Sequence, residues 1–368
     1  MDRNGKHLLA LLRSSLWGIP ADVEGIDWPK VLLLARQQTV LNLISDAVSH
    51  LPDELRPGED TLKKLQQYLM RNCQAHALLN RKVAETVSLM RSNDISPVLF
   101  KGQGLALNYP DPLLRQCGDI DLYVGKENYR KACEVAVKAY GAGEDNSESI
   151  KHMHLDNGGV SVEIHRIAES VPGLVRDRRF QEWTEHHLGH SQRRKVLIGG
   201  ISVDLPPVNF DAIYIMNHTW HHFVNGGIGI RQVCDWTLYL HRFHSSIDVH
   251  ELETDLDRLG LRKVWQLFSH IAVNHLGLPE NECPLYDGKH ARKAERVLDI
   301  IMDEGNFGRY SSHKSKPRPK GYSEGKFHSF KVNTLRVLRV MGVHPSYILM
   351  SWCHYVILGV YHFVKDFR

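Results

Sequence analysis

Two aspartates one residue apart carry the clearest chemical signal in this sequence. Asp119 and Asp121 lie in the run Asp119-Ile120-Asp121-Leu122-Tyr123-Val124, which has the composition of a buried strand. Because side chains alternate across a strand, both carboxylates project from one face. Buried like charges repel each other unless a cation lies between them. The pair therefore predicts a divalent metal site, and Mg²⁺ or Mn²⁺ fits because such hard cations bind carboxylates, water and phosphate oxygens.

A turn with two glycines precedes this strand. The apolar run 98–100 ends at Lys101-Gly102-Gln103-Gly104. Glycines let backbone N–H groups approach an anion, and a following helix offers its positive N-terminal end. Lys101 and Arg115 could both bind phosphate, Lys as a point charge and Arg as a bidentate fork. Alternatively, they pair with the aspartates. Together the turn and the acid pair predict a site for Mg²⁺ and a nucleoside triphosphate (NTP).

A predicted hairpin follows, at residues 152–155 and 160–167. Its connection, Asp156-Asn157-Gly158-Gly159, is a strong hairpin signal. On the second strand Glu163 and His165 share a face, so Glu163 is the candidate third metal carboxylate. His165 either takes part in the site or only hydrogen-bonds a neighbouring acid.

The segment 98–124 resembles an uncharacterised bacterial nucleotidyltransferase family, within the DNA polymerase β-like nucleotidyltransferase superfamily. The matching pattern comprises Leu99, Lys101, Gly102, Leu105, Ala106, Tyr109, Pro110, Pro112, Arg115, Asp119, Ile120, Asp121, Leu122 and Val124. Many superfamily members carry Gly-Ser or Gly-Gly at the turn, whereas this chain has Gly102-Gln103.

The resemblance implies a fold, a reaction and a ligand set. It implies an α+β fold, in which a small mixed sheet with helices forms the nucleotidyltransferase core. The reaction would transfer a nucleoside monophosphate from an NTP to an acceptor and release pyrophosphate. Asp119, Asp121 and Glu163 would hold the metal and carry the catalysis. The acceptor could be a small molecule, a protein or RNA.

A second stretch, between residues 209 and 236, is similar to another motif of the same family. His218 and His222 are four residues apart on a predicted helix, and Arg231 and Asp235 are four apart on the next. These residues either line the cleft opposite the metal or, in the case of Arg231 and Asp235, form an ion pair within one helix.

Helical periodicity dominates the rest of the chain. We predict three regions: a helical N-terminal region (1–92), with a long helix from Thr61 to Ser92, the nucleotidyltransferase core (93–207), and a helical C-terminal domain (208–368). A helix from Lys126 to Tyr140 and a single strand from Val196 to Leu205 are expected in the core.

The C-terminal domain contains a basic run followed by an apolar segment. Between Arg309 and Arg339 there are nine Lys or Arg residues and one acid, and proline, serine and glycine in the first half predict a loop. Such a loop is either simply solvated or attracts an acidic partner. The segment 347–364 predicts a packed terminal helix, with association at a membrane surface as the second interpretation.

Composition adds limits of its own. The chain has 368 residues, 42% hydrophobic content and a net charge of +4. Its six cysteines have no Cys-x-x-Cys spacing, which favours a reducing cytoplasm.

Two other functions stay open: a catalytically silent nucleotide-binding module, and a histidine-rich metal hydrolase with His165, His218 and His222 as ligands.

Overall fold

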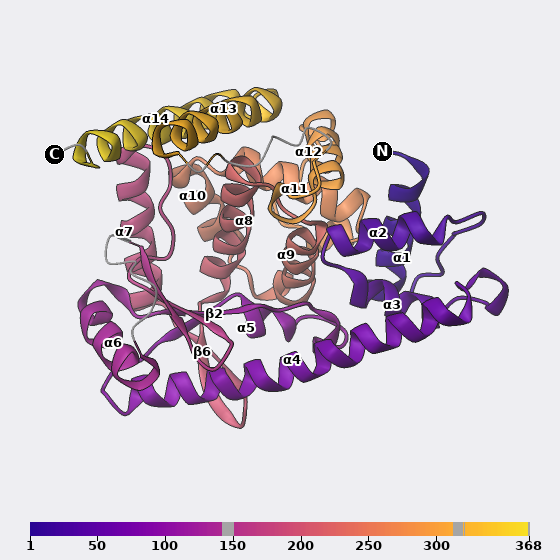
Figure 1. The fold of residues 1–368 in the computed structure, drawn as a ribbon, viewed down its shortest axis with the longest axis horizontal. Helices are drawn as coiled ribbons and strands as arrows, with labels where there is room; N and C mark the ends of the chain where they lie inside the picture. The colour runs from indigo at the N-terminus through magenta and orange to yellow at the C-terminus, as the bar shows by residue number, and fades with distance from the viewer. Residues whose placement is uncertain (142–150, 312–318, 320, 367–368) are drawn as a thin grey trace.

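The strands of the computed structural model form one mixed sheet (Figure 1). The structure describes residues 1–141, 151–311, 319 and 321–366. From edge to edge the six strands are β3 (His152–Asp156), β4 (Ser161–His165), β2 (Asp119–Tyr123), β1 (Val98–Phe100), β6 (Ile201–Leu205) and β5 (Arg194–Ile198). β2 runs parallel to β4, and β1 parallel to β6, while the other neighbours are antiparallel. The predicted small mixed sheet among helices is confirmed.

One face of this sheet packs against the long helix α4 (Glu59–Arg91) (Figure 1). Acidic residues occupy its first turn and Arg91 its last, which suits the helix dipole. Its 33 residues span about 50 Å, so α4 underlies both the sheet and the N-terminal helices. Leu79, Val83 and Val87 of α4 pack on Ile120 and Leu122 of β2. The predicted Thr61–Ser92 helix is therefore confirmed almost to the residue.

The opposite face meets α8 (Val208–Asn225) and α7 (Leu174–His190). Phe100 of β1 lies 4.6 Å from Tyr214 and 6.2 Å from Phe210 of α8, measured between ring centroids. Trp183 of α7 stacks on the same Phe210. Residues that alternate with the α4-facing ones, including Asp121, thus point into the space between the sheet and α8.

Most of the other helices share one hydrophobic core with α8. They are α1 (Arg3–Trp17), α2 (Trp28–Gln37), α3 (Leu41–Ser49), α9 (Ile230–Phe243), α10 (Val249–Leu259), α11 (Arg262–Asn274) and α12 (Ala291–Glu304). The short helix α5 (Gly102–Ala106) follows β1, and α6 (Gly125–Tyr140) follows β2. Because this core takes residues from all three predicted regions, their boundaries at 92 and 207 stay a prediction.

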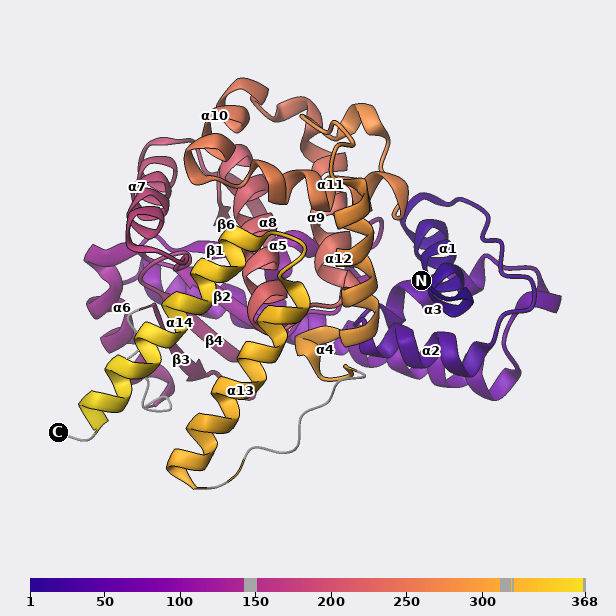
Figure 2. The same cartoon turned by 90° about the horizontal axis from the view of Figure 1, so that it is seen from above.

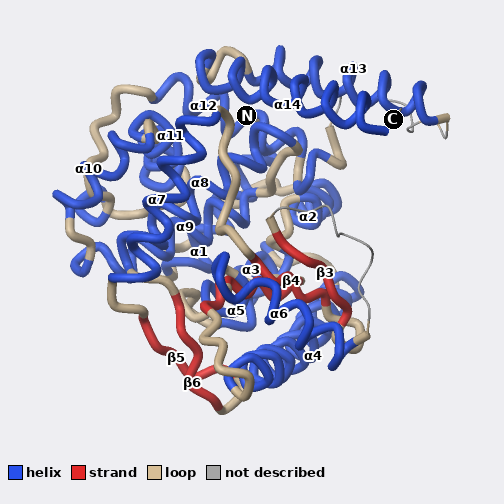
Figure 3. Tube along the Cα trace, turned by 90° about the vertical axis from the view of Figure 1, so that its left-hand side faces the viewer, coloured by secondary structure: helices blue, strands red, loops and turns tan. Residues whose placement is uncertain are grey.

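The prediction of a single strand from 196 to 205 is wrong, because the structure has two strands there. Residues 194–205 form a hairpin, β5 and β6, which turns at Gly199 and Gly200 with φ of 58° and 82°. A Cβ atom at Gly199 would lie 2.4 Å from the carbonyl oxygen of Asn80, so the turn presses closely on α4. The Gly-Gly pair is a hairpin signal that explains the break. Figure 3 shows the β5–β6 hairpin at one end of the sheet.

The predicted basic loop near 309–339 is also wrong for its second half. That half belongs to α13 (Tyr322–Val340), which pairs with α14 (Pro345–Asp366) in a helical hairpin (Figure 2). Arg336 and Arg339 ion-pair with Glu304 of α12, so two of the basic residues anchor the helix instead of remaining solvated. Lys314, Lys316, Arg318 and Lys320 lie outside the described residues.

The apolar segment 347–364 is helical, as predicted, and falls within α14. Tyr347 and Ile348 are buried in the main core, whereas Leu349 and Ile357 are exposed. Among the described helices, none combines the length and the apolar character needed to cross a bilayer.

Candidate active site

The predicted alternation along β2 is observed. Asp121 is 2% exposed on the α8 side of the sheet, while Ile120 and Leu122 are buried against α4. Asp119, at the first position of the strand, is exposed. The two carboxylates therefore lie on one face, with Asp121 deep and Asp119 at the rim.

Glu163 lies beside Asp121 because their strands pair in parallel register. The next polar residue on β4, His165, is 1% exposed and contacts both acids. Its Nε2 atom lies 2.9 Å from Oδ1 of Asp121 and 3.2 Å from Oε2 of Glu163. The sheet thus gathers Asp119, Asp121, Glu163 and His165. His165 does hydrogen-bond a neighbouring acid, and its further part in the site stays a prediction.

Positive groups compensate the three carboxylates unevenly. Burial acts to raise the pKa of Asp121, but Lys101 and the hydrogen bond to His165 outweigh it and hold that pKa well below its usual value. The pKa of Asp119 is instead raised, chiefly by the Asp121 carboxylate. Burial also opposes ionisation of His165, yet its hydrogen bonds to the acids raise its pKa. The site therefore has carboxylate repulsion left at its rim, which a cation would relieve.

The turn after β1 brings Lys101 into this site. Its Nζ atom lies 3.2 Å from Oδ2 of Asp121, as one of the two alternatives predicted. Lys101 has φ of 49°, and Gly102, with φ of 40°, lies so close to β2 that a Cβ atom would be 3.2 Å from the carbonyl oxygen of Asp119. A non-glycine residue in this conformation stores strain, which is common at functional sites.

Other parts of the turn differ from the expectation. The following helix, α5, has only five residues, so its dipole adds little to anion binding. The Gln103 side chain hydrogen-bonds Asn80 and His76 of α4 and so points away from the acids. Gly104 is buried near Leu205. Phosphate binding by Gly102, Gln103 and Gly104 therefore stays a prediction, and it would use their backbone N–H groups.

A buried hydrogen-bond chain extends from Lys101 toward α8. Lys101 Nζ lies 3.2 Å from Nε2 of His218, whose Nδ1 lies 2.9 Å from Oε2 of Glu169. Glu169 in turn pairs with Lys151 at 2.5 Å. Burial and the nearby Lys101 charge hold the pKa of His218 well below its usual value. Since an ammonium group can only donate, the neutral His218 accepts at Nε2 and donates from Nδ1 to Glu169.

Glu169 and Lys151 were not predicted. Glu169 lies in the connection after β4 and is 1% exposed. Its pKa is held well below its usual value because Lys151 and the histidines outweigh the effect of burial. Neither residue belongs to a periodic pattern, and a buried acid in a loop leaves no sequence signal.

Arg115 is used differently from the prediction. It does not pair with Asp119 or Asp121. Its Nε and Nη2 atoms form a bidentate ion pair with Asp235 of α9, at 2.7 and 2.9 Å. Tyr109 Oη and Arg231 Nη1 also contact Asp235, at 2.7 and 3.1 Å, so the predicted pair within α9 is present. Phosphate binding by Arg115 stays a prediction, and it would compete with this ion pair.

His222 lies one turn beyond His218 on α8, and their ring centroids are 4.4 Å apart. Burial lowers the pKa of His222 to about 4. In the part of the chain that the structure describes, His165, His218 and His222 do not gather as ligands of one ion. The set predicted for a metal hydrolase is therefore not formed.

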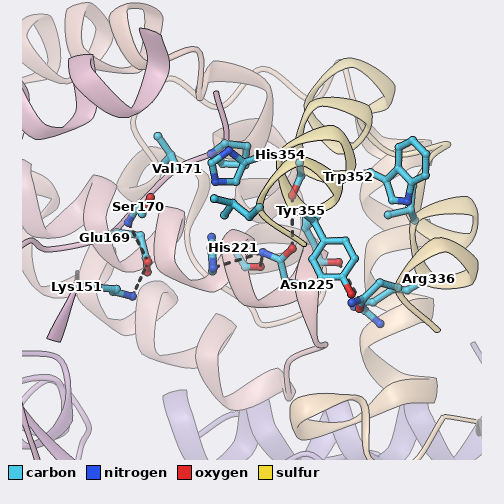
Figure 4. A pocket seen from close by; sticks show the side chains of 16 residues that line it. Lys151, Glu169, Ser170, Val171, His221, Asn225, Arg336, Trp352, His354 and Tyr355 are labelled. Atoms are coloured by element: carbon cyan, nitrogen blue, oxygen red, sulfur yellow. Dashed lines mark hydrogen bonds and ion pairs between the residues drawn. The ribbon is translucent and has the colours of Figure 1, made fainter. Parts of the chain in front are cut away.

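A pocket of about 430 Å³ adjoins the far end of the hydrogen-bond chain (Figure 4). Glu169 and Lys151 line one side, and His221 and Asn225 of α8 lie between them and α14. Trp352, Tyr355 and other residues of α13 and α14 line the opposite side. The pocket combines apolar and aromatic walls with a few polar groups, as small-molecule sites do.

Comparison with known proteins identifies the family. Residues 24–277 match the family described as uncharacterised nucleotidyltransferase. The chain belongs to this family. The match contains the acid pair, the Lys101 turn and α8, whereas the pocket residues of α13 and α14 lie beyond its end at residue 277.

Two further comparisons add little. The crystal structure of an antigenic nucleotidyltransferase-like protein from Paracoccidioides brasiliensis is similar over 50% of this chain and 85% of that chain, with 16% identity and a TM-score of 0.31. No curated protein matches this chain.

Proposed function

We propose that this chain transfers a nucleoside monophosphate from an NTP to an acceptor hydroxyl in a Mg²⁺-dependent, polymerase β-like reaction and releases pyrophosphate. The observation that carries the proposal is the row of carboxylates on adjacent strands, Asp119 and Asp121 beside Glu163, in a chain of a nucleotidyltransferase family. Lys101 at the edge of this row supplies a fixed positive charge near the acids.

The donor set suits Mg²⁺. The carboxylate oxygens are hard ligands, and the raised pKa of Asp119 marks repulsion that a divalent cation would remove. Asp119, Asp121 and Glu163 would hold the ion, which when bound stabilises charge on the transferred phosphoryl group and activates the acceptor hydroxyl. His165 contacts both Asp121 and Glu163 and so orients them, and Lys101, beside Asp121, would pair with an NTP oxygen.

The pocket between α8 and α14 is where we place the acceptor. Its volume suits a small molecule, and the Trp352 and Tyr355 rings offer stacking surfaces. At the end nearer the metal site, the Glu169 carboxylate accepts hydrogen bonds from His218 and from Lys151. An acceptor with an apolar or aromatic body and a hydroxyl group would match these walls.

Thermal unfolding with each NTP tests the nucleotide site. An NTP at about one hundred times its Kd stabilises the folded chain by roughly 2.7 kcal/mol, or roughly 3–4 °C at this length. We expect one or more NTPs to raise Tm by that amount with Mg²⁺ and not with EDTA. The Asp119→Asn/Asp121→Asn variant should lose the shift. If no NTP changes Tm, the proposed substrate is wrong, and a shift without any transfer of α-phosphate would identify a silent nucleotide-binding module.

A Trp352→Ala variant tests the acceptor pocket. Trp352 lies on α14, where it hydrogen-bonds Thr334 of α13, and outside the proposed metal and NTP ligands, so its loss should weaken acceptor binding and leave NTP binding unchanged. With α-labelled NTP and a small-molecule extract, we expect transfer to fall about tenfold at low extract concentration and to recover at high concentration. The NTP-induced Tm shift should stay unchanged. Leu338→Ala, at an exposed position of α13 outside the pocket, is the control. Equal transfer by both variants would place the acceptor elsewhere.

A further inference from the structure

Two histidines on the edge strand β3 extend the polar row beyond the three acids. His152 and His154 alternate with Met153 and Leu155, which pack toward α6. In the antiparallel register His154 lies opposite Glu163, and His152 lies opposite His165. Both imidazoles therefore share the sheet face that carries the carboxylates.

The nitrogen atoms of these rings converge on Glu163. His154 Nδ1 lies 3.4 Å from Oε1 and His152 Nε2 lies 3.7 Å from Oε2 of that carboxylate. The two Nε2 atoms are 2.8 Å apart. One ligand atom from each of the three residues lies within 4.8 Å of the others. Ligand atoms of a tetrahedral zinc ion with bonds near 2.0–2.1 Å are about 3.3 Å apart, so small side-chain adjustments suffice.

We propose that His152, His154 and Glu163 bind a transition-metal ion of the zinc class. Imidazole nitrogen favours Zn²⁺, Co²⁺ or Cu²⁺ over Mg²⁺, so the site differs in kind from the carboxylate site of Asp119 and Asp121. Glu163 belongs to both ligand sets and would bridge them. Because three protein ligands leave a coordination position open, a water or a substrate atom completes the site, as in catalytic zinc centres.

The surroundings of the three residues allow a metal ion to enter and orient the shared carboxylate. Their side chains are 20%, 38% and 17% exposed, so an ion can reach them from solvent. His165 Nε2, at 3.2 Å from Glu163, orients the shared carboxylate from the buried side. Such outer contacts fix the geometry of metal ligands. The inference does not depend on nucleotidyl transfer, since the ion itself is measured.

A second histidine-containing group provides an internal control. His270 of α11 and His275, which directly follows that helix, both contact Oε1 of Glu295 of α12, at 3.1 and 2.6 Å. This group has the same composition of two histidines and one glutamate. It lies outside the sheet, so its removal leaves the proposed site intact.

Co²⁺ titration of the full chain tests the proposal. After removal of metals by a chelator, we expect a Co²⁺ ion to bind with a visible absorption band typical of nitrogen ligation, and excess Mg²⁺ should not displace it. The His152→Gln/His154→Gln variant should bind at least 100-fold more weakly, whereas His270→Gln/His275→Gln should bind as the wild type does.

Three outcomes overturn the proposal: equal Co²⁺ affinity in wild type and the His152→Gln/His154→Gln variant, loss of binding only in His270→Gln/His275→Gln, and displacement by Mg²⁺. An unchanged Tm of the metal-free His152→Gln/His154→Gln variant shows that its loss of binding is local. The Mg²⁺-dependent NTP shift, measured on the same samples, separates failure of this site from failure of the proposed transferase.

Discussion

Asp119→Asn is expected to reduce transfer of α-phosphate by at least about 10³-fold while the protein stays folded. The amide keeps the size of the side chain but removes one negative ligand of the proposed metal site. Because the Asp121 carboxylate raises the pKa of Asp119, removal of this charge also relieves repulsion in the metal-free protein. We therefore expect Tm to stay unchanged or rise slightly, the signature of a residue that serves function at a cost in stability.

The measurement uses α-labelled NTP with a small-molecule extract, followed by separation of labelled products. Asp94→Asn is the matched control, because it makes the same chemical change at a carboxylate that is 99% exposed, and asparagine tolerates the φ of 57° there. Wild-type turnover by Asp119→Asn would show that the metal assignment is wrong. Equal loss in Asp94→Asn would point to a general effect on folding.

Asp235→Ala is expected to lower the free energy of unfolding by about 3–5 kcal/mol. Asp235 accepts two hydrogen bonds from Arg115, which is 5% exposed, and further contacts from Tyr109 and Arg231. Without the carboxylate, the Arg115 guanidinium remains buried without its charge partner. Urea unfolding monitored by circular dichroism gives the difference directly.

The double variant Arg115→Met/Asp235→Leu separates the ion pair from the buried space that it fills. Apolar side chains of similar size remove both charges of the pair, while Tyr109 and Arg231 still lose their contact with Asp235. We therefore expect a smaller loss of stability than in Asp235→Ala. The same variant also tests Arg115 as a phosphate ligand. A normal Mg²⁺-dependent NTP shift would assign Arg115 to structure alone, whereas loss of the shift in a stable variant would support the predicted phosphate contact.

Local patterns in the sequence were enough to predict the acid row. The alternation along 119–124 placed Asp119 and Asp121 on one face, and the Asp-Asn-Gly-Gly connection set the hairpin on which Glu163 and His165 share a face. Long helices such as α4 were equally predictable, because helical spacing repeats over many residues. Two other elements were predicted less well. The two short strands at 194–205 were predicted as one strand, and α13, with 19 residues, was predicted as part of a loop because its basic run begins with proline, serine and glycine.

The sequence by itself therefore determined the family, the acid pair and its third partner, because strand alternation and turn residues act over a few positions. Only the tertiary structure decided which charges meet. Arg115 and Asp235 are 120 residues apart in the sequence, and Glu169 and His218, which form a hydrogen bond, are 49 residues apart. The pocket exists only because the α13–α14 hairpin packs beside α8. Such contacts depend on the packing of whole helices, which no local pattern records.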